Sequence, residues 1–409
     1  MMASQTAPAN NALVGNNPQQ APALPPQHEA RLNAVLSQWR HWIATPALQE
    51  QPKATAYLPA GSGHYVVLVG AGAADDAQSP TAPSKQQFIV RLAQHTIQRP
   101  GYLLTTEAHW MLLAHRQRLA PTLVFVDILN QALVMDYIAT EVTSKATSKA
   151  ISAATSEAEH ISPRDIGTLL NAIHQLPAEG PAIDIKAIYN NYLNTAEQTR
   201  AMYPLRGDQP LAGSDSTQCQ QVAAAYPLLP ADNEDFNRCL ALLSAGPQCL
   251  CHNDLTRGNI LRSSSGPVAI DWEYAGIGSP WFDIAAALAD LSTAPSQPHP
   301  QTTSRDDFES CQTPAALKTD GASTLTGRPL RQDQHLARQQ LLSAACPDGI
   351  DAPLLAVAEA VYETVAAAWQ ATQADPVHRA DYRQIATQAE ALAERLREAA
   401  DAAETDRAS

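Results

Sequence analysis

Residues 248 to 285 place the strongest constraint on what this chain can fold into, and they read QCLCHNDLTRGNILRSSSGPVAIDWEYAGIGSPWFDIA. Short apolar segments at 249–251, 259–261 and 268–270 alternate with polar ones, which predicts short strands framing loops. The run of Ser and Gly at 263–267 predicts the turn between two of these strands. Asp254, Asn259 and Asp271 follow one another at intervals of five and twelve residues within this frame.

This spacing indicates a phosphoryl-transfer loop, in which one carboxylate accepts a hydroxyl proton while an Asn and a second Asp hold Mg²⁺. The transferred group carries spread negative charge, so catalysis depends on placement and on neutralisation by a metal. Mg²⁺ prefers hard oxygen ligands, which Asn and Asp side chains supply. The alternative is a polar turn that happens to contain His, Asp and Asn. A candidate base, a candidate amide ligand and a candidate carboxylate ligand occur at the spacing of such a loop and lie between predicted strands. This agreement favours the functional interpretation.

The motifs HNDLTRGNIL and AIDWEYAGIGSPWFDIA resemble those of the aminoglycoside phosphotransferase and choline kinase superfamily, which has a protein-kinase-like fold. The IDWEYAG version is most similar to the choline, ethanolamine and thiamine kinase branch. The resemblance implies that Asp254 is the catalytic base and that Asn259 and Asp271 are magnesium ligands. It also implies structural roles for His252 and for Asp283, which would brace the catalytic loop.

The resemblance implies an α+β chain with a protein-kinase-like two-lobed fold, a small β-rich N-lobe and a larger, mainly helical C-lobe. We expect a disordered tail at 1–27, an ATP-binding N-lobe at 28–136, and a C-lobe at 137–409 that carries catalysis and the substrate site. The tail is rich in Ala, Gln, Asn and Pro and lacks the regions of a signal peptide. Low-complexity inserts are expected near 140–160 and 293–333.

A glycine turn at Gly61, Ser62 and Gly63 lies between two predicted strands and is a candidate for binding nucleotide phosphates. Glycine lets the backbone approach a phosphate closely, although any hairpin can turn on Gly-Ser-Gly. Family members usually carry an Asn near the end of this turn, where His64 stands in this chain.

Arg91, in the strand 88–92, resembles the cation that binds the nucleotide phosphates in the family, because Arg is always charged and can bind phosphate bidentately. The predicted helix 105–119 carries Glu107, and two threonines are expected to cap it. Glu107 either pairs with Arg91, as in kinases generally, or complements the helix dipole from the first turn.

Two further strands are predicted at 124–127 and 132–138, with a turn at 130–131. The second resembles the hinge strand of the family. That resemblance implies that the backbone of Met135, Asp136 and Tyr137 binds the adenine edge.

The candidates for the acceptor site are Glu273, Trp281 and Trp369, with Tyr362 beside them. Aromatic faces attract quaternary or protonated amines. The alternative is that Tyr362 and Trp369 belong to an apolar stripe that packs the C-lobe. Glu273 is a candidate second carboxylate near the metal or near a cationic substrate.

Helical periodicity predicts the remaining secondary structure. His174 resembles a packing histidine of the family and is expected to be structural. The predicted helices span 28–44, 163–176, 183–203, 231–244, 280–291, 352–373 and 380–402.

Charge and cysteine usage narrow the class of protein. The net charge of −14, from 27 basic and 41 acidic residues, argues against binding nucleic acid or an anionic membrane and is compatible with a cationic substrate. No apolar stretch is long enough to span a membrane. The six cysteines form no zinc-knuckle spacing, and Cys249 and Cys251 fit small buried strand residues better than redox groups. We therefore expect reduced thiols and a cytoplasmic location.

Three hypotheses follow for the function. The first is an ATP- and Mg²⁺-dependent kinase for the hydroxyl of a small cationic amino alcohol, of the choline, ethanolamine or thiamine type. The second is an aminoglycoside phosphotransferase, with the same chemistry on a larger polycation. The third is a non-catalytic kinase-like protein that binds nucleotide, which the intact set of Asp254, Asn259 and Asp271 disfavours.

Overall fold

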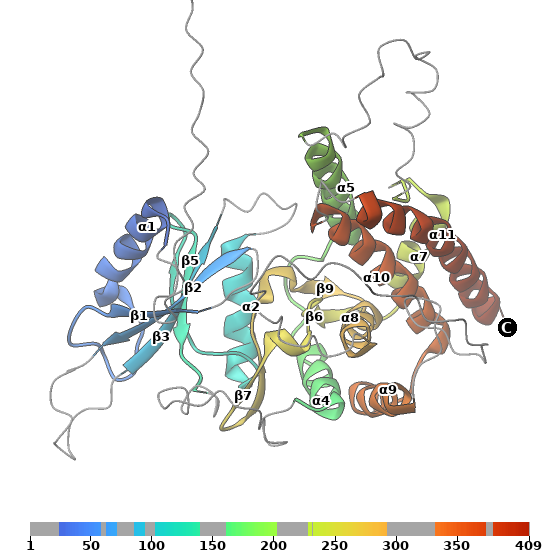
Figure 1. The fold of residues 1–409 in the computed structure, drawn as a ribbon. Helices are drawn as coiled ribbons and strands as arrows, with labels where there is room; N and C mark the ends of the chain where they lie inside the picture. Colours follow the sequence, from blue (N-terminus) through green and yellow to red (C-terminus); the bar gives the residue numbers. More distant parts are fainter. Residues whose placement is uncertain are drawn as a thin grey trace, which may run out of the picture. The chain divides into compact units, whose positions relative to one another are not determined.

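A computed structural model describes residues 24–58, 63–71, 86–94, 103–139, 161–202, 228–230, 232–292, 332–373 and 379–408. The chain divides into two compact units (Figure 1). The first contains the described residues up to Thr96 together with Asp127–Met135, and the second contains Ile97–Val126 and Asp136–Ser409. This grouping differs from the predicted N-lobe of 28–136, because the segment 97–126 belongs to the second unit.

Five strands form one sheet with the order β1-β2-β3-β5-β4. Strands β2 and β3 pair antiparallel in an unbroken register from His64↔Ala93 to Ala71↔Gln86, and a β-bulge interrupts β1 against β2. The five strands are β1 (Lys53–Leu58), β2 (His64–Ala71), β3 (Gln86–Ala93), β4 (Leu123–Asp127) and β5 (Ala132–Asp136).

Helix α1 (Pro26–Ser37) buries Leu32, Val35 and Leu36 and is anchored in the first unit by polar contacts. Arg31 donates to the carbonyl oxygens of Ala93 and Asn130. The helix begins inside the predicted tail and ends earlier than predicted, and a single 3-10 turn (Trp39–His41) follows.

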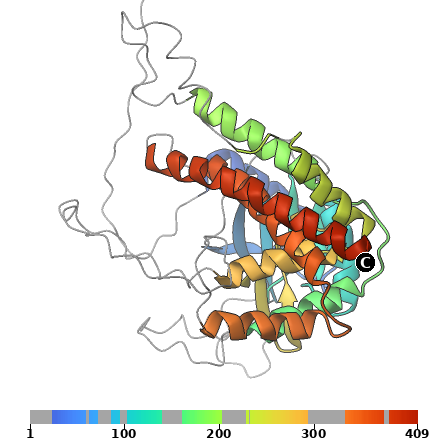
Figure 2. The same cartoon turned by 90° about the vertical axis from the view of Figure 1, so that its right-hand side faces the viewer.

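The second unit contains residues 248–285 and the helices around them. Helix α4 lies beside α9, and α10 runs beside α5, α8 and α11 (Figures 1 and 2). Its helices are α2 (Leu104–Arg116), α4 (Pro163–His174), α5 (Ile185–Met202), α7 (Glu234–Ala245), α8 (Pro280–Ser292), α9 (Gln332–Ala345), α10 (Ala352–Gln373) and α11 (Arg379–Ala408).

Two small antiparallel sheets in the second unit carry the residues around the predicted loop. Strand β6 (Cys249–Cys251) pairs with β9 (Gly276–Gly278), and β7 (Ile260–Ser263) pairs with β8 (Gly266–Ala269). One 3-10 turn, Arg257–Asn259, precedes β7, and another, Trp272–Tyr274, follows Asp271. The predicted strands are therefore confirmed within one or two residues.

The predicted α+β class is confirmed, with a smaller β-rich unit and a larger, mainly helical one. One local expectation is wrong, and one helix was not predicted. Helix α2 starts at Leu104, and no side-chain hydrogen bond caps it, so the two threonines lie inside its first turn. Helix α9 was not expected at all, because its sequence is polar and its apolar residues are few.

No helix among the described residues has both the length and the apolar character needed to cross a membrane. The predicted insert at 140–160, residues 293–331 of the insert predicted near 293–333, and most of the predicted tail lie outside the described residues, whereas residues 332 and 333 begin α9.

Candidate active site

The loop after β6 is held from behind by one fully buried carboxylate, Asp283, in the first turn of α8. Its Oδ2 accepts the backbone N–H of His252 at 2.8 Å, and its Oδ1 accepts the backbone N–H of Asn253 at 2.7 Å. His174 Nε2, at the end of α4, lies 3.1 Å from the same Oδ2. The predicted role of Asp283 as a brace is consistent with these contacts.

The pKa values of this buried group follow from its partners. Burial alone would raise the pKa of Asp283, but the hydrogen bond from His174 and the charges and backbone amide beside it outweigh burial and hold the pKa below its usual range. Burial opposes the charged form of His174 as well, yet the bond to Asp283 raises the pKa of that imidazole. His174 and Asp283 therefore form a charge-assisted hydrogen bond that is shielded from water.

His252 is fully buried, and burial lowers its pKa by more than the carboxylates of Asp283 and Asp271 and the bond to Ile270 raise it. Its Nε2 donates to the carbonyl oxygen of Ile270 at 3.0 Å, which joins the start of the loop to the residue before Asp271. Its ring meets Trp272 edge-on, with the centroids 4.9 Å apart. These contacts fit the structural role that the sequence predicted for His252.

Asp254 and Asn259 face each other across the loop. The Asn259 side-chain nitrogen donates to both the backbone carbonyl oxygen and Oδ2 of Asp254, at 2.9 and 2.8 Å. Because the amide nitrogen is turned toward Asp254, the amide oxygen is the atom of Asn259 that a cation would use. Both residues are half-buried, so the pair is accessible.

The β7–β8 hairpin brings Asp271 to the same end as Asn259. Ile260 pairs with Ala269, and the N–H of Ile270 donates to the carbonyl oxygen of Asn259 at 2.9 Å. Asp271 comes next and adopts a left-handed conformation, with φ 64° and ψ 63°. Residues other than glycine rarely adopt this conformation, which costs on the order of 1–3 kcal/mol and is typical of functional sites.

Asn253 adopts the same left-handed region, with φ 62°, at the other side of the loop. Its side-chain nitrogen donates to the carbonyl oxygen of Tyr274 at 3.0 Å. Both turns of the site, before Asp254 and at Asp271, are therefore held in uncommon backbone conformations by Asn and Asp, the residue types that tolerate them best.

The donor set around Asp271 fits a hard divalent cation. A carboxylate oxygen of Glu273 lies within 4.8 Å of one of Asp271, and Asn259 offers an amide oxygen at the same hairpin end. Oxygen donors from carboxylates and amides are the ligands that Mg²⁺ takes. The residues present therefore fit the predicted metal.

Arg257 and Asp290 form a contact that sequence reasoning missed. The backbone N–H and the guanidinium Nε of Arg257 both donate to Asp290 Oδ2, at 3.0 and 2.8 Å, and Nη2 donates to the Asp290 carbonyl oxygen at 2.7 Å. These bonds attach the middle of the loop to the last turns of α8. No spacing or periodicity signals a pair so far apart in the chain.

The predicted acceptor residues lie in different environments. Trp281 is buried, whereas Trp369 is 45 % exposed. Burial raises the pKa of Tyr362, and the carboxylates of Asp254 and Asp290 raise it further. Tyr362 also contacts Phe282 edge-on, which connects α10 with α8 beside the loop. Of the predicted aromatic residues, Tyr362 thus interacts electrostatically with Asp254.

A pair of tyrosines, which the sequence did not reveal, lies at the same loop. The hydroxyls of Tyr192, from α5, and Tyr274 are 2.7 Å apart. The Tyr274 backbone in turn accepts the bond from Asn253. Helix α5 is therefore tied to the loop by a polar contact.

The predicted nucleotide-binding residues fall in both units. Gly61 and Ser62 lie outside the described residues, and Gly63 lies in the first unit, where an added Cβ would meet nothing within 4 Å. Arg91 is buried, with Nη2 3.1 Å from His64 Nε2 on the neighbouring strand. His64, in the place of the family's usual Asn, therefore contacts the predicted phosphate cation. Met135 is buried in β5.

Glu107, Asp136 and Tyr137 belong to the second unit. Glu107 is buried in the first turn of α2, where the helix dipole also favours a carboxylate. The backbone N–H of Asp136 donates to the carbonyl oxygen of Thr122 at 2.9 Å, and Tyr137 is half-buried. A pairing of Glu107 with Arg91 and a hinge role for residues 135–137 stay predictions.

Comparison with known proteins identifies the family of the chain. The sequence profile described as the phosphotransferase enzyme family (APH) matches residues 58–318, more than half of the chain. No curated protein matches at a significant level.

Several solved structures align with most of this chain at low sequence identity and with TM-scores below 0.5. A choline/ethanolamine kinase family protein from Mesorhizobium loti has a TM-score of 0.47 at 14 % identity, with 90 % of this chain and 99 % of that chain covered. The choline kinase LicA from Streptococcus pneumoniae has a TM-score of 0.49 at 15 %, with the same coverage. An aminoglycoside-3'-phosphotransferase of type VIII has a TM-score of 0.42 at 13 %, with 83 % and 99 % covered. On the strength of the profile match, the chain belongs to the phosphotransferase enzyme family.

Proposed function

We propose that this phosphotransferase transfers the γ-phosphate of ATP to the hydroxyl of a small cationic amino alcohol, in the presence of Mg²⁺. The observation that carries the proposal is the pair of Asp254 and Asn259, which are joined at 2.8 Å in an accessible loop that a buried carboxylate supports from behind. This arrangement separates a carboxylate for the acceptor from oxygen ligands for a metal.

In the proposed reaction, Asp254 orients the acceptor hydroxyl and accepts its proton as the oxygen attacks the γ-phosphorus in line. The bond between the γ-phosphorus and the β–γ bridging oxygen breaks, and ADP leaves. The bond from the Asn259 amide keeps Asp254 Oδ2 in one orientation and leaves the remaining carboxylate edge for the hydroxyl. Asp283, through the amides of His252 and Asn253, positions the backbone on which Asp254 stands.

The amide oxygen of Asn259 and the carboxylate of Asp271 would hold Mg²⁺, with Glu273 as an additional carboxylate beside them. When bound, Mg²⁺ neutralises the negative charge of the nucleotide phosphates. Asp271 lies at the end of the β7–β8 hairpin, where its backbone is left-handed. The hydrogen bond from the N–H of Ile270 to the carbonyl oxygen of Asn259 keeps Asn259 and Asp271 at the same end of the hairpin.

Nucleotide contacts are proposed from the resemblance of the motifs. The turn Gly61–Gly63 and Arg91 would bind phosphates, Glu107 would orient Arg91, and the backbone at Met135–Tyr137 would bind adenine. Arg91 is held by His64, which limits its motion and favours a fixed cation over a mobile one.

A cationic acceptor is supported by the acidic and aromatic surroundings of Asp254. The carboxylate of Asp254 acts on Tyr362, so an acidic group and an aromatic ring lie near one another, while the carboxylate of Asp290, which also acts on Tyr362, is paired with Arg257. A protonated or quaternary amine is attracted by carboxylates and by aromatic faces. Trp281, in the first turn of α8, is proposed as a further wall of this region.

The experiment is a panel assay of ADP release with choline, ethanolamine, thiamine and a kanamycin-type aminoglycoside, each with Mg²⁺ and ATP. We expect one of the three small amino alcohols to give the highest kcat/KM. A preference for the aminoglycoside would replace the proposed acceptor by a polycation. A chain that binds ATP but releases no acceptor-dependent ADP with any of the four would contradict the proposed function.

A further inference from the structure

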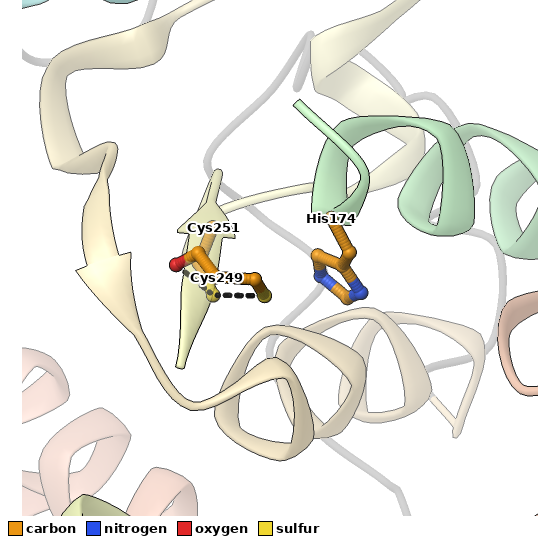
Figure 3. Close-up of side chains that lie close together, drawn as sticks. All are labelled: His174, Cys249 and Cys251. Carbon is orange, nitrogen blue, oxygen red and sulfur yellow. Dashed lines mark hydrogen bonds between the residues drawn. The ribbon is translucent and has the colours of Figure 1, made fainter. Parts of the chain in front are cut away.

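Two thiols and one imidazole gather behind the loop and take no part in the proposed reaction. They are Cys249 and Cys251 on β6 and His174 at the end of α4, and Figure 3 shows the imidazole directed toward the strand that carries both sulfurs. One ligand atom from each of the three lies within 4.8 Å of the others. The two sulfurs are 3.7 Å apart.

The strand itself explains why the thiols lie together. Successive side chains of a strand point to opposite faces, so residues two apart share a face. The register of β6 with β9 places Cys249 opposite Gly278 and Cys251 opposite Gly276. Since glycine has no side chain, nothing from the paired strand separates the two sulfurs. The pairing of β6 therefore holds a preformed pair of thiols.

The distance between the two sulfurs distinguishes a tetrahedral metal site from a linear one and from a disulfide. A tetrahedral ion with metal–sulfur bonds of about 2.3 Å places its sulfurs about 3.8 Å apart, and a linear one would need about 4.6 Å. The observed 3.7 Å fits the tetrahedral arrangement. A disulfide would need the sulfurs at about 2.05 Å, and residues two apart in a strand have Cα atoms about 6.6 Å apart, near the upper limit for such a bond.

His174 supplies a third ligand of a type that thiophilic divalent ions accept. Histidines that bind metals almost always have a carboxylate or carbonyl partner as well, which orients the ring and raises its basicity. His174 has such a partner, because its Nε2 lies 3.1 Å from the buried Asp283. Two sulfurs, one imidazole and a neighbouring carboxylate are a donor set typical of zinc, with a fourth position left for water.

We propose that Cys249, Cys251 and His174 form a site for one thiophilic divalent cation of the zinc class, distinct from the oxygen-donor site at Asn259 and Asp271. The proposed zinc-class site adjoins the catalytic loop but contains none of the residues proposed to bind the acceptor or Mg²⁺. Cys251 precedes His252 directly, and Asp283 contacts both His174 and the loop amides. The inference does not depend on the acceptor or on the reaction, since none of the three proposed ligands is assigned to either.

The test is a titration of the reduced full-length protein with Zn²⁺ against a chromophoric chelator, with excess Mg²⁺ present to fill oxygen-donor sites. The starting protein carries Cys219→Ser and Cys311→Ser, so that the two cysteines outside the described residues do not compete. We expect one equivalent of Zn²⁺ to bind. Co²⁺ in place of Zn²⁺ should produce the absorption bands of thiolate–cobalt charge transfer, which oxygen-donor sites do not give.

Cys249→Ser is the first variant, because Cys249 is half-buried and tolerates the change better than the fully buried Cys251. It should weaken Zn²⁺ binding at least about tenfold, since the loss of a direct ligand costs at least as much as the loss of an outer partner. Cys346→Ser is the matched control, also half-buried, and should leave the affinity unchanged.

His174→Gln should weaken Zn²⁺ binding as Cys249→Ser does, and circular dichroism of each variant checks that it is folded. Zn²⁺ binding that is equal in Cys249→Ser and in its parent would overturn the proposal. A folded parent protein that binds no Zn²⁺, or that gives no thiolate–cobalt bands, would overturn it as well.

Discussion

Asp254 and Asp283 stand 29 residues apart in one stretch, and the structure uses them in opposite ways. Asp283 is fully buried and accepts hydrogen bonds from two backbone amides and one imidazole. Asp254 is half-buried and is oriented by the amide of Asn259. The buried support layer, formed by Asp283, His174 and the backbone of His252–Asn253, stabilises the loop. The accessible edge, formed by Asp254, Asn259 and Asp271, is left for chemistry.

This difference teaches that a charge can be placed for stability or for reaction, but the same charge rarely serves both. A buried carboxylate is held by partners that consume its lone pairs, so it has no capacity left for a substrate. An accessible carboxylate keeps that capacity and contributes little to the fold. Variants of the two residues should therefore separate turnover from stability.

The largest effect is expected on turnover for Asp254→Asn. The amide keeps the shape of the side chain but does not accept a proton, so kcat should fall by about 10²–10⁴-fold, the range for a general base. The rate of ADP release with the preferred acceptor measures the change, and thermal unfolding should give the parent's midpoint. The exposed Asp401→Asn, a control with the same chemical change, should keep full activity. Wild-type turnover in Asp254→Asn would remove Asp254 from the mechanism.

Asp283→Asn should instead lower the free energy of unfolding, by about 3–5 kcal/mol, as expected when one partner of a buried pair is replaced. An amide has one acceptor oxygen, so at least one of the three donors around Asp283 would face an NH₂ group. Denaturant unfolding followed by circular dichroism gives the value. Asp401→Asn again serves as the control, because Asp401 is mostly exposed in its ion pair with Arg238 and should cost about 0–1 kcal/mol. Equal losses in the two variants would contradict the assignment of Asp283 to the support layer.

A smaller loss of stability is expected for Gly167→Ala, which tests the position of the helix that carries His174. A Cβ at Gly167 would lie 2.2 Å from the carbonyl oxygen of Leu341 in α9, so α4 and α9 would have to move apart. Overpacking of this kind costs about 1–3 kcal/mol, although alanine is the better helix former. Thr168→Ala, exposed on the same helix, should change unfolding by no more than about 0.5 kcal/mol. A stabilised Gly167→Ala would show that the two helices are packed less closely.

The smallest effect is a dependence of stability on pH through His174. The bond to Asp283 raises the pKa of His174 in the folded protein, so its stabilising contribution is complete below the unfolded pKa and is lost as pH rises through the folded pKa. Melting temperatures of the wild type and His174→Gln, measured from about pH 6 to about pH 8 with a chelator present, should therefore converge as pH increases. His252 is common to both proteins and cancels in the difference. A gap that widens with pH would reverse the assigned direction.

The sequence predicted the elements of the site well because its local signals agree. Alternation at 249–251, the Ser-rich turn and the spacing from Asp254 to Asp271 each depend on neighbours in the chain, and the structure has the strands and the hairpin there. Helix α10 has the predicted bounds, since its apolar residues recur at the helical period over six turns.

The contacts that position the site were less accessible to sequence reasoning. The bonds of Arg257 with Asp290 and of Tyr192 with Tyr274 join residues whose separation carries no pattern. Helix α9 escaped prediction because Leu336 is exposed and the buried Leu341 and Leu342 are adjacent, so the helical period is weak. The threonines at α2 were assigned a cap from residue type alone, although the chain places them inside the first turn of the helix.

The central claim is that acceptor chemistry and metal binding belong to different carboxylates at the accessible edge. The most direct measurement is calorimetry of ATP binding in the presence of Mg²⁺, on Asp254→Asn and Asp271→Asn side by side. We predict that Asp254→Asn keeps the wild-type affinity while Asp271→Asn binds at least about tenfold more weakly, because a direct ligand of the metal is lost. Wild-type affinity in Asp271→Asn, or a loss confined to Asp254→Asn, would contradict the account.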